Sequence, residues 1–246
     1  MTVSFADPFA GKTWWIVGAS EGLGKALARQ MDAKGATLIL SARSPEKLSR
    51  IAASLSSATA LPMDVTNAKS VSTAMAQAQH ADAVLYCVGT YEPVQAKDWN
   101  ASAIEQMIDT NFTGAVRVLA GVVPNFVTRG SGRIMLIGSL SGYRGLPAAI
   151  GYSASKAALM HLAENLLIDL KGTGVTVQMA NPGFIKTRLT AKNDFDMPQL
   201  MSPDAAATHV MNAIHSGRFE TAFPRPFAWV FKWGRYLPRG LFNRLF

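Results

Sequence analysis

The chain has a single cysteine among its 246 residues, Cys87, so no disulfide can form within it. Its four histidines (His80, His161, His209 and His215) lie far apart, and no spacing typical of metal ligands joins them. The first residues lack the basic and then apolar pattern of a signal peptide, and the apolar run over 14–18 is too short to span a membrane. We therefore expect a cytoplasmic protein without a metal site.

Acidic residues are also scarce. Sixteen Asp and Glu face 24 Lys and Arg, which gives a formal net charge of +8, and the excess gathers near the end of the chain. After Pro224, aromatic side chains alternate with Arg and Lys. Such a tail favours either peripheral contact with anionic lipid, or a segment that covers a substrate pocket or an oligomer interface. No recognition motif accompanies the charge, so we expect no nucleic-acid partner.

The length and the apolar fraction of 49% suit one domain with a sizeable core. No repeat, low-complexity tract or linker interrupts the chain. We expect a single α/β domain over 1–223, followed by a basic aromatic tail over 224–246 that packs on or extends the same domain.

Short apolar runs alternate with longer helical patterns, which is typical of βαβ units and a parallel sheet. Polar residues and glycines follow the predicted strands at their carboxyl ends, where open parallel sheets bind ligands. The predicted strands cover 13–17, 37–41, 59–63, 83–88, 133–138, 175–180 and 219–223, and the predicted helices cover 22–34, 45–54, 67–79, 102–128, 152–171 and 203–215.

A glycine-rich turn joins the first strand to the first helix, with the spacing Gly18-x-x-x-Gly22-x-Gly24. Glycines let the backbone approach a phosphate closely, and the N–H groups at the helix start can then bind a pyrophosphate. The same residues match the G-x-S-x-G elbow of serine hydrolases, with Ser20 as nucleophile. That alternative is weaker, because only one strand precedes Ser20 and the late histidines lie on a predicted helix.

Tyr152 and Lys156 are four residues apart and therefore share one face of a helix. A fixed positive charge beside a phenol favours the phenolate and lowers its pKa, which would make Tyr152 a proton donor and acceptor near neutral pH. Lowering that pKa by about three units needs about 4 kcal/mol of differential interaction. The alternative for this pair alone is a solvated lysine beside a half-buried tyrosine.

The motifs together resemble the short-chain dehydrogenase/reductase family, over nearly the whole chain. They are the Gly18 to Gly24 turn, Asp64-Val65, Asn111, Ser139, Tyr152-x-x-x-Lys156, and Asn181-Pro182-Gly183 followed by Ile185 and Thr187. The resemblance implies a doubly wound parallel sheet (Rossmann-like) of about seven strands in a single domain. One departure is the segment after the fourth strand, where the family's Asn-Asn-Ala-Gly reads Tyr86-Cys87-Val88-Gly89.

The family also implies roles for the matching residues. Tyr152 would be the catalytic acid or base, Lys156 would lower its pKa and bind the nicotinamide ribose, Ser139 would orient the substrate oxygen, and Asn111 would hold a proton-relay water. Ser139 could instead cap a turn, and Asp64 could cap a helix. The implied cofactor-binding residues are Gly18, Ser20, Glu21, Gly22, Leu23, Gly24, Arg43, Asp64, Val65, Gly89, Tyr152, Lys156, Pro182, Gly183, Ile185 and Thr187.

The cofactor is predicted to be NADP rather than NAD. The second strand is followed by Ala42-Arg43-Ser44 with no acid, and Arg43 can pair with the 2′-phosphate. The expected substrate is a carbonyl or secondary alcohol on an apolar body, held by walls over 91–94, 140–146 and 184–199. The resemblance implies a homodimer or homotetramer formed through the helices that carry Asn111 and Tyr152. The remaining alternative is a non-catalytic protein that only binds a nucleotide.

Overall fold

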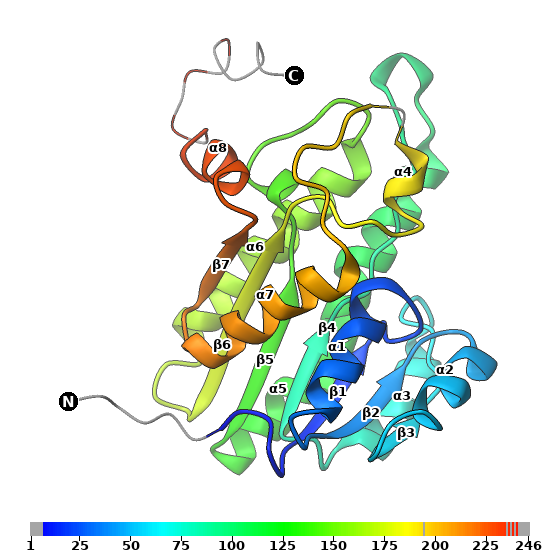
Figure 1. Cartoon of the computed structure of the whole chain (residues 1–246), viewed down its shortest axis with the longest axis vertical. Helices are drawn as coiled ribbons and strands as arrows, with labels where there is room; N and C mark the ends of the chain where they lie inside the picture. Colours follow the sequence, from blue (N-terminus) through cyan, green and yellow to red (C-terminus); the bar gives the residue numbers. More distant parts are fainter. Residues whose placement is uncertain (1–6, 194, 235, 237, 239, 241–246) are drawn as a thin grey trace.

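A computed structural model describes residues 7–193, 195–234, 236, 238 and 240. Seven parallel strands form one sheet in the order β3-β2-β1-β4-β5-β6-β7 (Figure 1). This order reverses direction beside β1, as expected for a doubly wound sheet, and it confirms the predicted fold class. The strands are β1 Thr13–Val17, β2 Thr37–Ser41, β3 Ala58–Ala60, β4 Ala83–Tyr86, β5 Gly132–Ile137, β6 Val175–Pro182 and β7 Glu220–Phe223.

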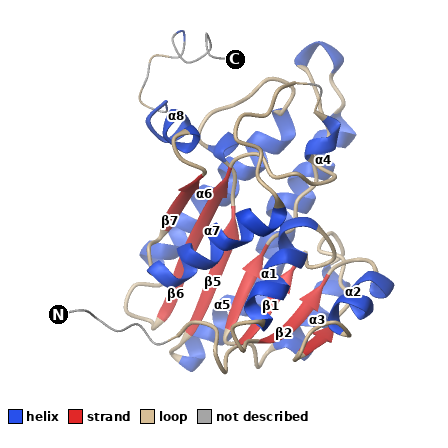
Figure 2. Ribbon diagram, viewed as in Figure 1, coloured by secondary structure: helices blue, strands red, loops and turns tan. Residues whose placement is uncertain are grey.

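Helices cover both faces of the sheet (Figure 2). Because side chains alternate along a strand, β1 sends Trp14 and Ile16 into one core layer and Trp15 and Val17 into the other. The first layer packs under α1 and α7, and the second under α3, α5 and α6. The helices are α1 Gly22–Asp32, α2 Pro45–Ala52, α3 Ala68–Ala78, α4 Ala101–Ile108, α5 Gly114–Arg129, α6 Ile150–Asp169, α7 Pro203–Ser216 and α8 Phe227–Gly234.

The single helix predicted over 102–128 is wrong. A π-helical turn, Asp109–Thr113, separates α4 from α5, whereas Pro124 lies inside α5 without ending it. The Tyr86 hydroxyl donates a hydrogen bond to the carbonyl of Thr110 at 2.6 Å, within this turn. The turn holds Asn111, and π-helical turns often occur at functional sites.

The third strand is shorter than predicted and covers Ala58–Ala60 rather than 59–63. The backbone continues along β2, since the amides of Leu61 and Met63 donate to the carbonyls of Leu40 and Ala42 at 2.8 and 3.0 Å. It therefore still delivers Asp64 to the carboxyl-end edge of the sheet.

Helix α8 packs beside the carboxyl ends of β5 and β7. Ala228 and Phe231 of α8 are buried against Leu140, which follows β5. Figure 1 shows α8 beyond the carboxyl end of β7. In the described residues, no helix is long and apolar enough to cross a membrane.

Candidate active site

A cleft of about 540 Å³ opens at the carboxyl ends of the strands. All sixteen residues predicted to bind the cofactor line it. Ser139 lies in the adjoining pocket, and Asn111 is buried behind the cleft. The structure thus brings together side chains from seven separate segments of the chain.

The glycine-rich turn forms one wall of the cleft, and glycine is required there by space. Gly18 has a φ of 102°, and a Cβ at this position would lie 2.9 Å from the backbone of Cys87. A Cβ on Gly24 would lie 2.0 Å from the Gly18 carbonyl oxygen. Only glycine therefore lets α1 start this close to β1, with the N–H groups of its first turn available to a phosphate.

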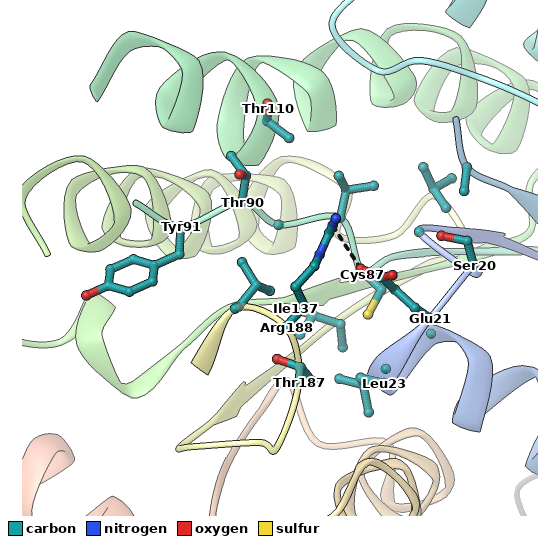
Figure 3. Close-up of a pocket in the computed structure, with 18 of the residues that line it drawn as sticks. Ser20, Glu21, Leu23, Cys87, Thr90, Tyr91, Thr110, Ile137, Thr187 and Arg188 are labelled. Atoms are coloured by element: carbon teal, nitrogen blue, oxygen red, sulfur yellow. Dashed lines mark ion pairs between the residues drawn. The ribbon is translucent and has the colours of Figure 1, made fainter. Parts of the chain in front are cut away.

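Charged side chains surround this turn. The Glu21 carboxylate lies 2.9 Å from the Arg188 guanidinium, and this ion pair joins the turn to the loop after β6 (Figure 3). The same carboxylate lies 3.3 Å from the Lys47 ammonium of α2. Arg43 also lines the cleft, and within the described residues no ion pair occupies it. With Asp64 included, three cations stand against two carboxylates, which still leaves this end of the cleft positively charged.

Asp64 lines the cleft but does not cap α3. Its carboxylate accepts hydrogen bonds from the backbone and hydroxyl of Thr66, at 3.0 and 2.8 Å. Asn67 caps the helix instead, with its side chain accepting from the Ser70 amide at 2.9 Å. The cap interpretation of Asp64 is therefore wrong, and its place in the cleft agrees with contact to a ligand.

Lys156 and Tyr152 lie at the floor of the cleft. Lys156 is 3% exposed, and its ammonium donates a hydrogen bond to the Ile137 carbonyl at 2.9 Å and lies 5.8 Å from the centre of the Tyr152 ring. Burial lowers the pKa of Lys156 to about 8, and interaction with Cys87 opposes the shift. The solvated-lysine alternative is therefore wrong.

The direction of the Tyr152 shift differs from the sequence-based expectation. Burial raises the pKa of Tyr152, and the hydrogen bond with Ser139 opposes this only in part. The reason is that desolvation disfavours the phenolate more than its neighbours favour it. Without a ligand, Tyr152 therefore holds its proton firmly at neutral pH.

Ser139 both caps a turn and contacts Tyr152. Its hydroxyl oxygen accepts hydrogen bonds from the amide and hydroxyl of Ser141, at 3.2 and 3.0 Å. Its own hydroxyl hydrogen is thereby left to donate toward Tyr152 or a substrate oxygen. The capping role is therefore confirmed, and it leaves the hydroxyl hydrogen available for the other role considered for Ser139.

Asn111 is fully buried in the π-helical turn. Its amide nitrogen donates to the Thr90 carbonyl and to Ser155, both at 3.0 Å, and its oxygen accepts from the Thr90 amide at 2.7 Å. A Cβ placed on Gly89 would lie 3.9 Å from the Lys156 nitrogen and 4.0 Å from the Asn111 oxygen. Glycine at 89 therefore keeps open the space between Asn111 and Lys156.

A second, smaller pocket of about 100 Å³ opens beside Ser139 and Tyr152. Its walls are mostly apolar and aromatic, and none of the described side chains lining it is charged. Two of the walls come from the predicted segments around Tyr91 and over 140–146. The third combines the loop after β6 with α8, whose Phe227 contacts Phe184 at a ring separation of 5.8 Å.

Several lining residues were not predicted. Phe227 and Phe231 come from the tail, where only the alternative of a pocket-covering segment anticipated them. Lys47 carries charge into the cleft, and its only sequence signal is nearness to the end of β2. Arg188 lies within the predicted substrate wall over 184–199, but it lines the charged cleft and not the apolar pocket. The serine hydrolase is excluded here, because none of the four histidines lines the cleft that holds Ser20.

Comparison with known proteins agrees with this geometry. The family model described as short chain dehydrogenase matches residues 12–197. An uncharacterized oxidoreductase of Myxococcus xanthus is 36% identical over 240 residues, which cover 94% of this chain and 95% of the relative. The solved structure of a short-chain dehydrogenase from Sphingobium yanoikuyae in complex with NADPH is 26% identical, has a TM-score of 0.83, and matches over 94% of this chain and 95% of that one. A Burkholderia cenocepacia short chain dehydrogenase in complex with NADP is 23% identical, has a TM-score of 0.87, and shares the fold over 96% of this chain and 98% of that one.

Proposed function

This chain belongs to the short-chain dehydrogenase family, and we propose that it is an NADP-dependent oxidoreductase acting on a carbonyl or secondary alcohol of a small, largely apolar molecule. The observation that carries the proposal is the meeting of Ser139, Tyr152 and Lys156 where the charged cleft joins the apolar pocket. A polar cofactor fits the first cavity and an uncharged substrate fits the second.

The residues present fit a dinucleotide. The glycine turn at the start of α1 would hold the pyrophosphate. The Lys156 ammonium has three hydrogens, and one of them is used by the Ile137 carbonyl, so two remain for ribose hydroxyls. Asp64 and Val65 would contact the adenine. The bound cofactor would supply or accept the hydride.

Tyr152 and Ser139 would act on the substrate oxygen. During carbonyl reduction, Ser139 donates a hydrogen bond to the oxygen, and Tyr152 transfers its proton to it as negative charge develops. The pKa of Tyr152 is raised by burial, so this proton is in place at neutral pH. In the oxidation direction, Tyr152 must first lose the proton, which the nearby Lys156 ammonium favours.

Lys156 and Asn111 would return the proton to Tyr152. The space that Gly89 leaves between them is lined by one donor and one acceptor, which is suited to a relayed proton. Asn111 is held by three hydrogen bonds, so its oxygen keeps a constant position toward this space.

NADP is favoured by the charge at the far end of the cleft. Arg43 follows β2, where an NAD enzyme would carry an acid for the ribose hydroxyls. Lys47 adds a second cation from the first turn of α2, and Glu21 holds it at 3.3 Å. A 2′-phosphate would therefore meet positive charge from two side chains.

The test is a panel of uncharged ketones, aldehydes and secondary alcohols, followed by absorbance of the reduced nicotinamide. Turnover with NADPH and its loss in Tyr152→Phe would support the proposal. NADPH binding by fluorescence with no turnover across the panel would favour the non-catalytic alternative. Preference for NADH would refute the cofactor assignment while leaving the reaction intact.

A further inference from the structure

One face of helix α8 lines the apolar pocket, and the other face is exposed. Phe227 and Phe231 line the apolar pocket, with ring centres 5.1 Å apart. Trp229, Val230 and Trp233 point outward and are 50%, 40% and 64% exposed. The helix lies beyond residues 12–197, which the family model matches. Trp229 and Trp233 are four residues apart and therefore lie on one face of the helix. A cluster of exposed large apolar side chains of this kind marks an interaction surface.

Two polar contacts attach this helix to the domain. The Arg144 guanidinium donates to the Gly234 carbonyl at the end of α8, from Nε at 3.1 Å and Nη2 at 3.0 Å. Lys232 pairs with Glu220 of β7 at 2.9 Å, and the other oxygen of Glu220 accepts from Tyr143 at 2.5 Å. The outward tryptophans are therefore presented by a docked helix.

The segment that carries the exposed face is basic in sequence, and one of its basic side chains lies beside the exposed aromatic residues. Tyr236 extends the aromatic stripe, with its ring centre 6.3 Å from that of Trp233, and it is 73% exposed. The Arg225 guanidinium lies 5.7 Å from the centre of the Trp229 ring. Over 224–246 the sequence has five basic residues and no acidic one (Arg225, Lys232, Arg235, Arg239 and Arg244).

We propose that the face of α8 formed by Trp229, Val230, Trp233 and Tyr236 docks on an anionic lipid surface, with Arg225 paired to a lipid phosphate and the basic composition of 224–246 adding attraction. Tryptophan and tyrosine rings settle at the boundary of headgroups and acyl chains, and basic residues add attraction to anionic lipid. Since the opposite face of the same helix lines the apolar pocket, the lipid surface would lie about one helix diameter, roughly 10 Å, from that pocket.

A bilayer suits this surface better than a second copy of the chain. A twofold interface sets the same patch against itself, so the Arg225 beside Trp229 would face its own copy, and the segment 224–246 has no acid to pair with it. Exposed apolar residues that could support an oligomer lie on other helices, at Val116 and Val127 of α5 and at Leu167 and Ile168 of α6.

Vesicle co-sedimentation tests the proposal directly. Full-length protein would be mixed with phosphatidylcholine vesicles, with or without one quarter phosphatidylglycerol. We expect binding to the anionic vesicles that weakens at high salt. Trp229→Ser with Trp233→Ser should lower the partition coefficient about ten-fold or more. Arg225→Gln should lower it about five-fold, since a basic residue near the surface contributes about that much.

Trp99→Ser is the matched control, because Trp99 is equally exposed, at 63%, but lies far along the chain from α8. It should bind vesicles like the wild type, and near-ultraviolet circular dichroism would check that each variant is folded. Equal sedimentation of wild type and the double tryptophan variant overturns the proposal. A wild-type protein that does not bind anionic vesicles also overturns the proposal. In that case, dissociation of an oligomer by the double tryptophan substitution, seen in light scattering, would assign the face to a second copy of the chain. Loss of binding to single-stranded RNA in the same variant would assign it to RNA.

Discussion

Replacing Lys156 with methionine should make the cofactor-free protein more stable while removing its activity. The buried ammonium has a pKa of about 8, against an ordinary value of 10.5. That difference corresponds to about 3 kcal/mol by which folding disfavours the charged form. Methionine has a similar length and no charge, so it avoids this penalty but loses the hydrogen bond to Ile137, which contributes about 1 kcal/mol. The expected net gain at pH 7 is about 2 kcal/mol.

The gain should depend on pH in a defined direction. Below pH 8 Lys156 is protonated in both the folded and the unfolded state, so the full penalty is present. Between pH 8 and 10.5 the folded state binds fewer protons than the unfolded state, so the wild type gains stability as pH rises. By pH 10 only about 1 kcal/mol of the penalty remains, which matches the lost hydrogen bond, so wild type and variant should be about equally stable.

Urea unfolding at pH 7 and pH 10 measures both effects, and the melting temperature at pH 7 should rise by about 4–8 °C. Lys171→Met is the matched control, because Lys171 is exposed just beyond α6, and its stability should equal that of the wild type at both pH values. A methionine variant less stable than the wild type at pH 7, or a stability gap that does not narrow by pH 10, would refute the reasoning. Carbonyl reduction by the variant should fall about 100-fold or more, since Lys156 supports proton transfer.

Three further outcomes are expected. Burial raises the pKa of Tyr152, so carbonyl reduction should be constant from pH 6 to pH 7, whereas alcohol oxidation should rise with pH. Reduction should then fall above pH 7 as Lys156, with a pKa of about 8, loses its charge. Tyr152→Phe should abolish both reactions, and a wild-type reduction rate that declines from pH 6 to pH 7 would contradict this. Arg43→Asp should shift the ratio of kcat/KM with NADPH to kcat/KM with NADH by at least about ten-fold toward NADH, and Lys47→Met should shift it more weakly in the same direction. An unchanged ratio in both variants would rule out this phosphate site. Tyr86→Phe removes the hydroxyl that donates to the π-helical turn, so the free energy of unfolding in urea should fall by about 1 kcal/mol. The value of kcat should also fall, because Asn111 in that turn is displaced, and a variant with wild-type kcat would show that the turn forms without this hydrogen bond.

Local patterns carried much of the prediction. Short apolar runs predict the seven strands. The spacing of Gly18, Gly22 and Gly24 predicts the turn, because a tight connection from strand to helix requires glycine at close contacts. The pairing of Tyr152 with Lys156 follows from helix geometry alone. These features depend on residues close in sequence, so they can be deduced without the tertiary structure.

Other features depend on contacts between distant segments, and local patterns did not predict them. The π-helical turn forms where Tyr86, from β4, donates a hydrogen bond to the Thr110 carbonyl. Because Tyr86 lies outside 102–128, the local pattern of that segment resembles one unbroken helix. Glu21 meets Lys47 and Arg188 across three separate segments. The position of α8 in the pocket wall rests on contacts with Leu140 and Phe184.

The sequence by itself determined the fold class, the order of its elements, and most of the residues that meet in the cleft, because a parallel sheet collects the ends of its strands along one edge. Only the tertiary structure decided how those residues behave. Burial raises the pKa of Tyr152, which the sequence predicted to fall, and lowers that of Lys156. The physical reason is that charge pairing depends on spacing along a helix, whereas desolvation depends on what the rest of the chain packs around the pair.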